Sequence, residues 1–402
     1  MKIAGIVAEY NPIHNGHAFH IQQTKNVDGT CRATHVVAVM SGNFIQRGGP
    51  AVMPKADRVR AALACGVDLV LELPLPWAMA SAEAFATGAV GVLDALGCVD
   101  DLSFGSECGD LRLLNKVVDA LESERFSTLV RYYCDGGVSF PAARQKAVQE
   151  IAGERVAGLL ELPNNTLGIE YIKAIRAINS EITPFTVARI GTPHDGMLPI
   201  GEFASASYLR ELIMAGRLDT AMRFMPAEAR AVLHRAMADG HAPADEKSAQ
   251  RAVLAHLRRL SKVEISRLPG ISEGLENRIY DSIRQCGNLQ ELYDFIKTKR
   301  YTMTRVRRIV WSGFLGLTAD MALLPIPYIR VLGLNGRGEE ILSVVKKSRK
   351  LPLLSRPSQL SALSEGARQV FETECRAADL YAMTVPVPFP CGSELTDGVI
   401  RV

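Results

Sequence analysis

Short apolar runs rich in β-branched residues alternate with helix-like segments through the first half of the chain. The five runs occupy residues 2–10, 34–42, 67–74, 100–107 and 183–191. Each is short enough to be one strand and apolar enough to be buried on both faces, as the strands of a parallel sheet are. The segments between them, such as residues 55–66 and 81–97, end near a glycine, which is a helix stop signal. This alternation predicts an α/β fold with a doubly wound parallel sheet.

The pattern changes at about residue 204, where the strand-like runs stop. From there to residue 317 apolar residues recur at helical spacing, which predicts a helical domain. The tail regains strand-like runs at residues 327–334 and 341–347, followed by a helix candidate at residues 364–382. We therefore expect three parts, namely a sheet domain over residues 1–212, a helical domain over 213–320, and a small C-terminal α/β segment over 321–402 that packs on the other two.

Composition indicates a folded protein without a membrane segment or a structural zinc site. Apolar residues make up 48% of the 402 residues and charged residues 22%, which is an ordinary globular balance. The eight cysteines include no CxxC pair, so we expect reduced thiols, no metal-ligating residues of a structural zinc site and a cytoplasmic location. The apolar start is too short for a secretory signal, and the apolar region near residues 65–80 is interrupted by charged residues and prolines. The net charge of +3 is too small to indicate a nucleic-acid partner by itself.

Three of the eight histidines lie within residues 14–20, directly after the first predicted strand. Ligands of open α/β sheets bind beyond the carboxyl ends of the strands, where helix amino termini offer N–H groups to anions. His14 and His17 would therefore lie beside a phosphate, and an imidazole can donate to a phosphoryl oxygen or carry positive charge as negative charge builds. Gly16 between them lets a nucleotide approach the backbone closely. Taken singly, each histidine would also fit an ordinary loop or helix surface.

The segment "HNGH", preceded by "EYNP", resembles the HIGH motif of the nucleotidyltransferase superfamily, whose members activate a substrate with the α-phosphate of ATP. The second superfamily signature is a Ser-Ser-Thr-x-Ile-Arg run, and "SASYLR" at residues 205–210 is similar to it. Ala206 replaces the second serine, but Ser205 and Ser207 can cap a helix while Arg210 forks onto phosphate oxygens. Alone, "SASYLR" would read as a helix cap with a surface arginine. Neither a P-loop motif nor a GxGxxG dinucleotide fingerprint occurs.

The resemblance extends to the tRNA(Met) cytidine acetate ligases, a bacterial family that acetylates the wobble cytidine of elongator methionine tRNA. Six segments occur in the family's order between residue 3 and about residue 212, and weaker similarity continues through "RYTMTRVRR" and "YIRVLGLNGRG". The six are "GIVAEYNPIHNGHAFH", "AVMSGNFIQRGGPAV", "GVDLVLELPLPWA", "SFGSE", "PNNTLGIEY" and "SASYLREL". This resemblance implies a Rossmann-like sheet domain of nucleotidyltransferase type. It also implies that ATP, with Mg²⁺, and acetate form acetyl-adenylate, which then acetylates the N4 amine of cytidine.

The resemblance also implies site residues. By the resemblance, the catalytic residues are His14, His17 and Arg210. The residues that would bind the nucleotide are Val7, Ala8, Glu9, Tyr10, Asn11, Pro12, Ile13, His14, Asn15, Gly16, His17, Ala18, Phe19, His20, Gly105, Asn164, Asn165, Arg189, Ser205 and Ser207. An asparagine amide can contact adenine or ribose, and an arginine can neutralise phosphate, but which of the two asparagines contacts the nucleotide stays open. The family has Tyr-His-Asp after this arginine; here His194 and Asp195 follow without the tyrosine, so the role of that position also stays open.

A basic cluster in the predicted helical domain favours an RNA partner. Residues 297–308 contain no acid and six basic residues, which are Lys297, Lys299, Arg300, Arg305, Arg307 and Arg308. Tyr301 beside them would stack on a splayed base, and "KKSRK" at residues 346–350 adds four more cations. From charge alone a solvated helix face fits equally well. The ligase resemblance implies elongator tRNA(Met) as the partner.

Two other functions fit parts of the sequence. A small-molecule nucleotidyltransferase would transfer AMP to a metabolite and release pyrophosphate, but such enzymes are usually small and lack a long basic helical half. A non-catalytic RNA-binding protein would keep the nucleotide site as a scaffold. The intact His14, Gly16, His17 and Arg210 argue against that. Acyl selectivity, metal requirement and oligomeric state do not follow from the sequence.

Overall fold

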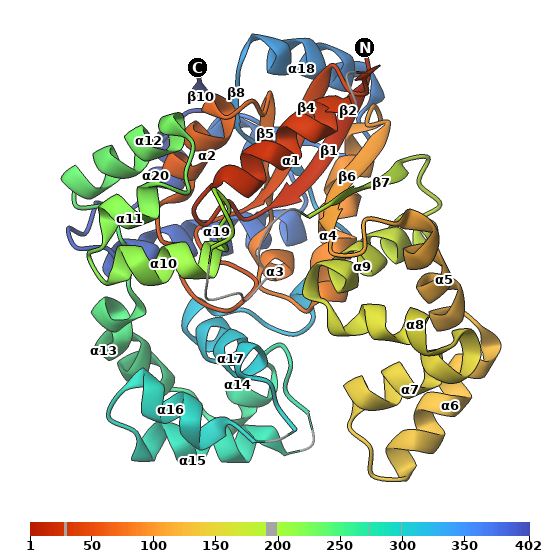
Figure 1. Ribbon diagram of the computed structural model, residues 1–402. Coiled ribbons are helices and arrows are strands. Elements are labelled where there is room, and N and C mark those ends of the chain that lie inside the picture. The colour runs from red at the N-terminus through yellow and green to blue at the C-terminus, as the bar shows by residue number, and fades with distance from the viewer. Residues whose placement is uncertain (28–29, 190–198, 273, 299) are drawn as a thin grey trace.

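The computed structural model of the 402-residue chain describes residues 1–27, 30–189, 199–272, 274–298 and 300–402 (Figure 1). His194, Asp195 and Lys299, which the sequence marks as site candidates, lie outside the described residues. Within the described part, none of the helices combines the length and the apolar character that a bilayer crossing requires.

The five runs predicted as strands form the parallel part of one sheet, in the order β5-β4-β1-β6-β7. Their bounds are β1 Ile3–Ala8, β4 His35–Ser41, β5 Leu69–Leu73, β6 Asp101–Ser106 and β7 Thr183–Ala188. The strand order reverses at β1, because the chain builds β4 and β5 on one side and then crosses to β6 and β7 on the other. Such a reversal opens a ligand crevice at the carboxyl ends of the strands, and "HNGH" follows β1 at that edge.

Helices cover both faces of the sheet and bury two separate apolar clusters. On one face lie α1 Asn15–Lys25, α2 Lys55–Ala64, α10 Ala206–Met214, α11 Leu218–Met222 and α12 Ala227–Ala238. On the other lie α4 Ala82–Leu96, α5 Leu111–Leu121, α9 Pro163–Ala177, α18 Gly336–Ser348 and the first half of α19 Glu365–Tyr381. The predicted stop of α4 is confirmed, since its C-cap Gly97 adopts the left-handed conformation with a φ of 67°. Short elements complete this part: β2 Asn26–Val27, β3 Thr30–Cys31 and α3 Leu75–Ala78.

A helical insertion between β6 and β7 was not predicted from the sequence. Between α5 and α9 it contains α6 Glu124–Asp135, α7 Phe140–Ala152, α8 Glu154–Ala157 and the 3-10 turn η1 Gly158–Glu161. Helix α6 buries none of its residues, and α6 and α7 project away from the sheet at the lower right of Figure 1. No strand-like run separates these helices. The alternation of strand-like and helix-like segments, from which the fold was predicted, therefore did not reveal the insertion.

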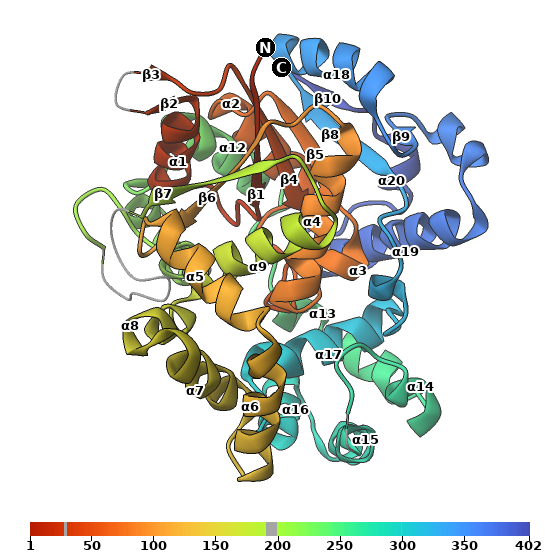
Figure 2. The same ribbon diagram turned by 90° about the vertical axis from the view of Figure 1, so that its right-hand side faces the viewer.

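The region from residue 204 to residue 317 is helical, as predicted, but its helices belong to two different cores. Helices α10, α11 and α12 pack in the cluster beside β1 and β4 and so extend the sheet domain. The helical subdomain, as residues 244–317 are called here, consists of α13 Glu246–Leu257, α14 Lys262–Ser266, α15 Leu275–Gln285, α16 Leu289–Ile296 and α17 Met303–Leu315. These helices build most of a second core, which Phe44, Leu75 and Tyr381 from the rest of the chain join. The helical subdomain lies at the bottom of both views (Figures 1 and 2). Helices α10 to α12 therefore share an apolar cluster with the sheet, whereas α13 to α17 do not.

The C-terminal segment completes the main sheet. Strand β8 Ile329–Leu334 pairs antiparallel with β5, and β9 Leu353–Leu354 and β10 Ile400–Arg401 pair with β8. The run at residues 341–347 is not a strand, contrary to expectation. It belongs to α18, which begins after the N-cap Asn335 and buries Ile341 and Val345. Two apolar residues four positions apart lie on the same face in a strand and also in a helix, so their spacing does not distinguish the two structures. The N-cap at Asn335 is the feature that indicates a helix. The remaining short elements are η2 Met321–Leu323, η3 Pro357–Ala362, η4 Ala382–Thr384 and α20 Ser393–Thr396.

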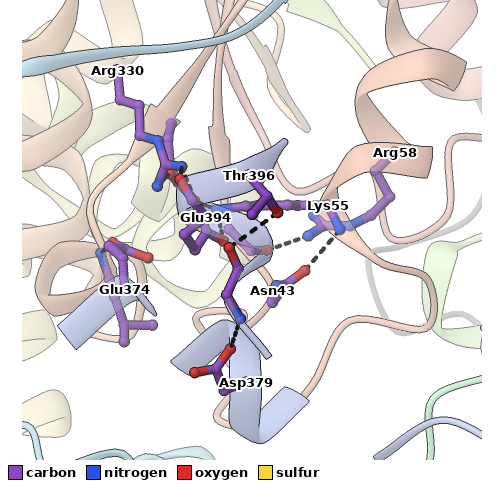
Figure 3. A network of polar contacts seen from close by, with 12 residues as sticks. Asn43, Lys55, Arg58, Arg330, Glu374, Asp379, Glu394 and Thr396 are labelled. Carbon is purple, nitrogen blue, oxygen red and sulfur yellow. Dashed lines mark hydrogen bonds and ion pairs between the residues drawn. The ribbon is translucent and has the colours of Figure 1, made fainter. Parts of the chain in front are cut away.

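A buried ion network fastens this C-terminal segment to the carboxyl end of β5 (Figure 3). Lys55 Nζ lies 2.6 Å from a carboxylate oxygen of Glu72 and 2.6 Å from one of Glu394. Arg330 pairs with the other oxygen of each carboxylate, at 2.9 Å for Glu72. Glu374 accepts the first backbone N–H of α3, and burial, together with the charge of Glu72, raises its pKa to about 8. Two cations therefore balance two anions, with Glu374 protonated at neutral pH.

The substitution Glu374→Gln should flatten the pH dependence of stability. The pKa of Glu374 in the folded protein is above its ordinary value of 4.5, so the folded state keeps a proton that the unfolded chain releases. The wild type should therefore lose stability as pH rises from about 5 through about 8, whereas glutamine has no proton to release. Thermal melts across that range measure the effect, with the exposed Glu372→Gln on the same helix as control. Parallel curves for all three proteins would contradict the prediction.

Candidate active site

A cavity of about 220 Å³ lies at the carboxyl ends of β1, β6 and β7, where the strand order reverses. Most of the residues predicted to bind nucleotide line it: Val7, Ala8, Glu9, Tyr10, Asn11, His14, Gly16, His17, Phe19, His20, Gly105, Asn164, Arg189, Ser205, Ser207 and Arg210. Five others do not line it: Pro12, Ile13, Asn15, Ala18 and Asn165. The structure thus brings the two motifs together around one cavity, although they lie about 190 residues apart in the chain.

The "HNGH" segment caps helix α1 with its own side chains. His14 is the N-cap, and its Nδ1 accepts the N–H of Gly16 at 3.1 Å. Nδ1 of His17 accepts the N–H of His14 at 3.3 Å, and the two rings stack with their centroids 3.8 Å apart. A ring nitrogen that accepts an N–H bond carries no proton, so each neutral ring is protonated at Nε2. Both rings line the cavity, which places the two imidazoles where a ligand would contact them.

The first backbone N–H groups of α1 are already occupied. The N–H of Asn15 donates to the carbonyl of Phe224 at 2.9 Å, and that of Gly16 donates to His14. These bonds overturn the expectation that the amino terminus of α1 offers its N–H groups to an anion, and they leave that role to the imidazoles. Glycine at position 16 leaves space for the His14 ring, since a Cβ there would lie 2.9 Å from Cε1 of that ring.

His20 links α1 to β6 inside the cavity. Its Nε2 lies 3.0 Å from Oγ of Ser103, which in turn lies 2.7 Å from Oγ1 of Thr24. Burial, and to a lesser extent the charge of Arg189, lowers the pKa of His20 to about 4. The ring is therefore neutral at neutral pH and supplies no positive charge to a ligand.

The "SASYLR" segment begins helix α10 and reaches across to the "HNGH" loop. Ser205 is the N-cap and accepts an N–H bond from the first turn at 3.1 Å. Arg210 donates through Nη1 to the carbonyl of Asn11 at 2.8 Å and through Nη2 to Oγ of Ser207 at 3.0 Å. Ala206 and Ser207, the first two residues of the helix, line the cavity, and their N–H groups have no acceptor among the described residues. The amino terminus of α10 is therefore suited to bind a phosphate group.

Arg210→Lys should lower ATP turnover about tenfold or more while changing the melting temperature little. Lysine keeps the charge but loses the planar fork, so one nitrogen cannot serve both the Asn11 carbonyl and the Ser207 hydroxyl in the arginine's geometry. Steady-state ATP kinetics and a melting curve measure both effects. Arg217→Lys, at an exposed position just after α10, is the matched control. Unchanged turnover in Arg210→Lys would remove "SASYLR" from the active site.

Glu107 organises the β6–β7 side of the cavity. Its two oxygens accept the backbone N–H groups of Asn164 and Asn165 at the start of α9, at 3.1 and 2.7 Å. The side chain of Asn164 donates to the same carboxylate at 2.7 Å and accepts from Nη1 of Arg189 at 3.4 Å. Asn165 is fully buried and accepts the N–H of Cys108 at 3.1 Å. Asn164 and Arg189 thus face the cavity, while Asn165 fixes the loop behind it.

Several residues of the cavity were not predicted from the sequence. They are Ile6, Gln46, Arg47, Phe85, Phe104, Leu167, Tyr171, Val187, Ala188, Phe203, Ala204 and Ala206. Gln46 and Arg47 follow β4, so the rule that ligands bind at the carboxyl ends of parallel strands is the signal that finds them. Phe85 and Tyr171 lie on helices at the spacing of core residues, and that spacing contains no functional signal.

The basic cluster that the sequence predicts is partly exposed and partly built into the fold. Lys297 and Arg300 are exposed just before α17. Arg305 donates to the carbonyl of residue 270 at 3.0 and 2.7 Å and lies over the ring of Tyr301. Tyr301 is only 7% exposed and packs in the helical subdomain, so the expectation that it stacks on an RNA base is wrong.

Three other basic groups contact other parts of the fold. Arg307 and Arg308 donate to backbone carbonyls of the loop after β4, at residues 48 and 46. The "KKSRK" segment, residues 346–350, ends helix α18 and meets the end of α4 through a backbone bond to Ala95. Helix α18 lies at the top and the helical subdomain at the bottom of both views, so this segment does not extend the basic cluster (Figures 1 and 2).

Known proteins resemble this chain over its whole length. A family model described as HIGH Nucleotidyl Transferase matches residues 1–390. The tRNA(Met) cytidine acetate ligase of Acetivibrio thermocellus is 38% identical over 416 residues, which cover 100% of both chains. The ligase of the same name from Caldicellulosiruptor saccharolyticus is 39% identical over 393 residues, covering 95% of this chain and 94% of the relative.

Solved structures agree with this relationship. The crystal structure of apo Thermotoga maritima TmcAL matches with a TM-score of 0.94 and 32% sequence identity, and the match covers 100% of both chains. The crystal structure of the same protein bound with alpha-thio ATP matches with a TM-score of 0.92, again at 32% identity and with complete coverage. The mostly parallel sheet with helices on both faces is thus the fold of these proteins.

Proposed function

This chain belongs to the HIGH nucleotidyl transferase family, and within it to the tRNA(Met) cytidine acetate ligases, and we propose that it is the ligase that its relatives' names describe. It uses ATP to activate acetate and acetylates the N4 amine of the wobble cytidine of elongator tRNA(Met). The observation that carries this proposal is the convergence of both motifs on one cavity at the reversal of the strand order.

The reaction divides into two steps. In the first, an acetate oxygen attacks the α-phosphorus of ATP, the bond to the β-phosphate oxygen breaks, and acetyl-adenylate and pyrophosphate form. In the second, the N4 amine of cytidine attacks the acetyl carbonyl, AMP leaves, and the nitrogen loses a proton. Negative charge builds on the phosphate oxygens in the first step, so donors fixed in advance around them lower its barrier.

Four sets of donors surround the place where the phosphates would lie. The Nε2–H groups of His14 and His17 are fixed by the caps of α1. The guanidinium of Arg210 and the first N–H groups of α10 approach from the other motif. Arg189, held by Asn164, is a further cation on the wall of the cavity. The imidazoles and both guanidinium groups are held by bonds to other protein groups, and Ser205 caps helix α10, so little reorganisation is needed when the nucleotide binds.

Mg²⁺ is proposed to enter with the nucleotide. Among the described residues, no group of three or more His, Cys, Asp or Glu side chains is placed to hold a metal ion. Magnesium commonly keeps several water ligands and binds through substrate phosphates with few protein carboxylates. Glu9 is a carboxylate that lines the cavity, although it already accepts the N–H of Gln46 at 2.9 Å. Because ATP and tRNA are the substrates, we place the reaction in the cytoplasm.

The tRNA is proposed to bind on the exposed part of the basic cluster. Lys297 and Arg300 are exposed on the helical subdomain just before α17, and Lys299 belongs to the same run of sequence outside the described residues. Arg305, in the first turn of α17, is half-buried and bonds to the carbonyl of Gly270. Lysine and arginine side chains there would neutralise phosphates of the anticodon stem, which makes binding depend on salt. The acceptor base would then enter the cavity by leaving its stack, as single-stranded loop bases do.

Pyrophosphate exchange and acetylation together test this function. The purified protein should exchange labelled pyrophosphate into ATP only when acetate is present, and should transfer labelled acetate to elongator tRNA(Met) in the presence of ATP. Exchange that requires a different small molecule would favour a small-molecule nucleotidyltransferase. Binding of tRNA without any exchange would favour a non-catalytic RNA-binding protein. Nucleosides from a deletion strain should lack N4-acetylcytidine in this tRNA.

A further inference from the structure

The loop after β4 forms one wall of the nucleotide cavity. It turns tightly at residues 45–49, where the N–H of Ile45 donates to the carbonyl of Gly49 at 3.1 Å and the N–H of Gly48 donates to that of Ile45 at 2.9 Å. The tip of the turn, Gln46 and Arg47, lines the cavity. The position of this turn therefore sets the position of two residues in the active site.

Helix α17 holds the other side of the same turn. Arg307 Nε donates to the carbonyl of Gly48 at 3.0 Å, and Arg308 Nη1 donates to the carbonyl of Gln46 at 3.3 Å. The two carbonyls flank Arg47. Gly48 has a φ of +78°, and a Cβ there would lie 2.4 Å from the backbone nitrogen of Arg308. Backbone packs directly on backbone at this point, which leaves the turn little freedom to move away from the helix.

Both arginines are themselves held in place. Arg307 bonds to the two carboxylate oxygens of Glu246 at 3.1 and 2.8 Å and lies over the ring of Tyr293. Arg308 is half-buried, and burial together with the charge of Arg305 lowers its pKa. A guanidinium fixed by protein carbonyls in this way is a structural donor, in contrast to the exposed Lys297 and Arg300.

We propose that Arg307 and Arg308 are positioning residues for acetate activation, which hold Gln46 and Arg47 against the nucleotide, and not contacts to RNA. The proposal rests on the proposed function. It revises the sequence-based expectation that assigned both arginines to tRNA binding. It also gives the helical subdomain a part in the first chemical step, because α17 belongs to that subdomain and the turn belongs to the sheet domain.

The decisive measurement is acetate-dependent pyrophosphate exchange without any tRNA, because a residue that only contacts RNA cannot affect it. Arg308→Met removes the bond to Gln46 while keeping most of the apolar stem. It should lower kcat/KM for ATP about 10- to 100-fold, as displacement of active-site groups by about 1 Å does. Arg308→Lys can still donate to the same carbonyl and should recover part of the loss. Binding of tRNA at fixed salt should stay close to the wild-type value.

Arg258→Met is the matched control. Arg258 lies in the same subdomain and donates through Nη2 to the carbonyl of Cys286 at 2.9 Å, away from the turn. The Arg258→Met variant should exchange pyrophosphate at the rate of the wild type. Normal exchange with weakened tRNA binding in Arg308→Met would overturn the proposal and restore the RNA assignment. If the methionine variant does not fold, normal exchange by folded Arg307→Met would overturn it instead. Absence of acetate-dependent exchange in the wild type itself would refute the proposed function, so the two failures are distinguishable.

Discussion

Replacement of His17 by alanine should abolish acetate-dependent ATP turnover while leaving the fold intact. The ring lines the cavity, and its Nε2 carries the proton because its Nδ1 accepts the N–H of His14. A fixed donor that meets charge as it develops on the α-phosphate lowers the barrier by roughly 3 to 4 kcal/mol, so turnover should fall about 100- to 1000-fold. Pyrophosphate exchange driven by acetate measures this step without any contribution from tRNA.

Two more substitutions at this position separate the donor from the cap. His17→Asn places an amide oxygen where Nδ1 accepts the N–H of His14, so it keeps the cap and should be as inactive as alanine. His17→Gln extends an amide N–H toward the place of Nε2 and should retain more activity. His256→Ala, at an exposed position on α13, controls for the loss of an imidazole elsewhere. Near-wild-type formation of acetyl-adenylate by His17→Ala would exclude the residue from the chemistry.

The parallel sheet could be predicted from the sequence because its strands are buried on both faces. Strands β4 and β5 are buried at every residue, and such runs stand out against the helices between them. The C-terminal segment lacks this contrast. Ile341 and Val345 are one turn apart in α18, and their spacing alone fits a strand equally well. The place of β8 beside β5 depends on long-range pairing that leaves no local pattern in the sequence.

The motifs of the candidate site could be predicted because both directly follow a local signal, the end of β1 and the cap of α10. Their supporting contacts could not, since these join residues far apart in the chain. Glu107 holds the start of α9 from 57 residues away, and Arg307 reaches Gly48 across 259 residues. For the basic cluster, the sequence shows the positive charge, but it does not show which guanidinium groups donate to backbone carbonyls of the protein. Burial of Tyr301 likewise depends on packing that only the folded chain defines.

Arg330→Met should cause a large loss of stability. The side chain of Arg330 is 12% exposed and faces two carboxylates, Glu72 and Glu394, whose side chains are 1% and 2% exposed. Without it, Lys55 alone must balance both anions in a buried place. Removing one partner from a buried ion network costs about 3 to 5 kcal/mol, because the remaining charge is neither hydrated nor paired. Urea denaturation at neutral pH measures the change in the free energy of unfolding.

Arg60→Met distinguishes burial from charge as the cause. Arg60 pairs with Asp57 at 2.8 Å and borders the same cavity of about 1050 Å³ as Arg330, but its side chain is 44% exposed. Water can replace the lost partner there, so the cost should be at most about 1 kcal/mol. A second change tests the mechanism further: Glu394→Gln added to Arg330→Met removes one uncompensated carboxylate and should recover part of the stability. If the double variant is no more stable than Arg330→Met, the loss comes from the packing of the arginine side chain over Phe371 and not from the unbalanced charge.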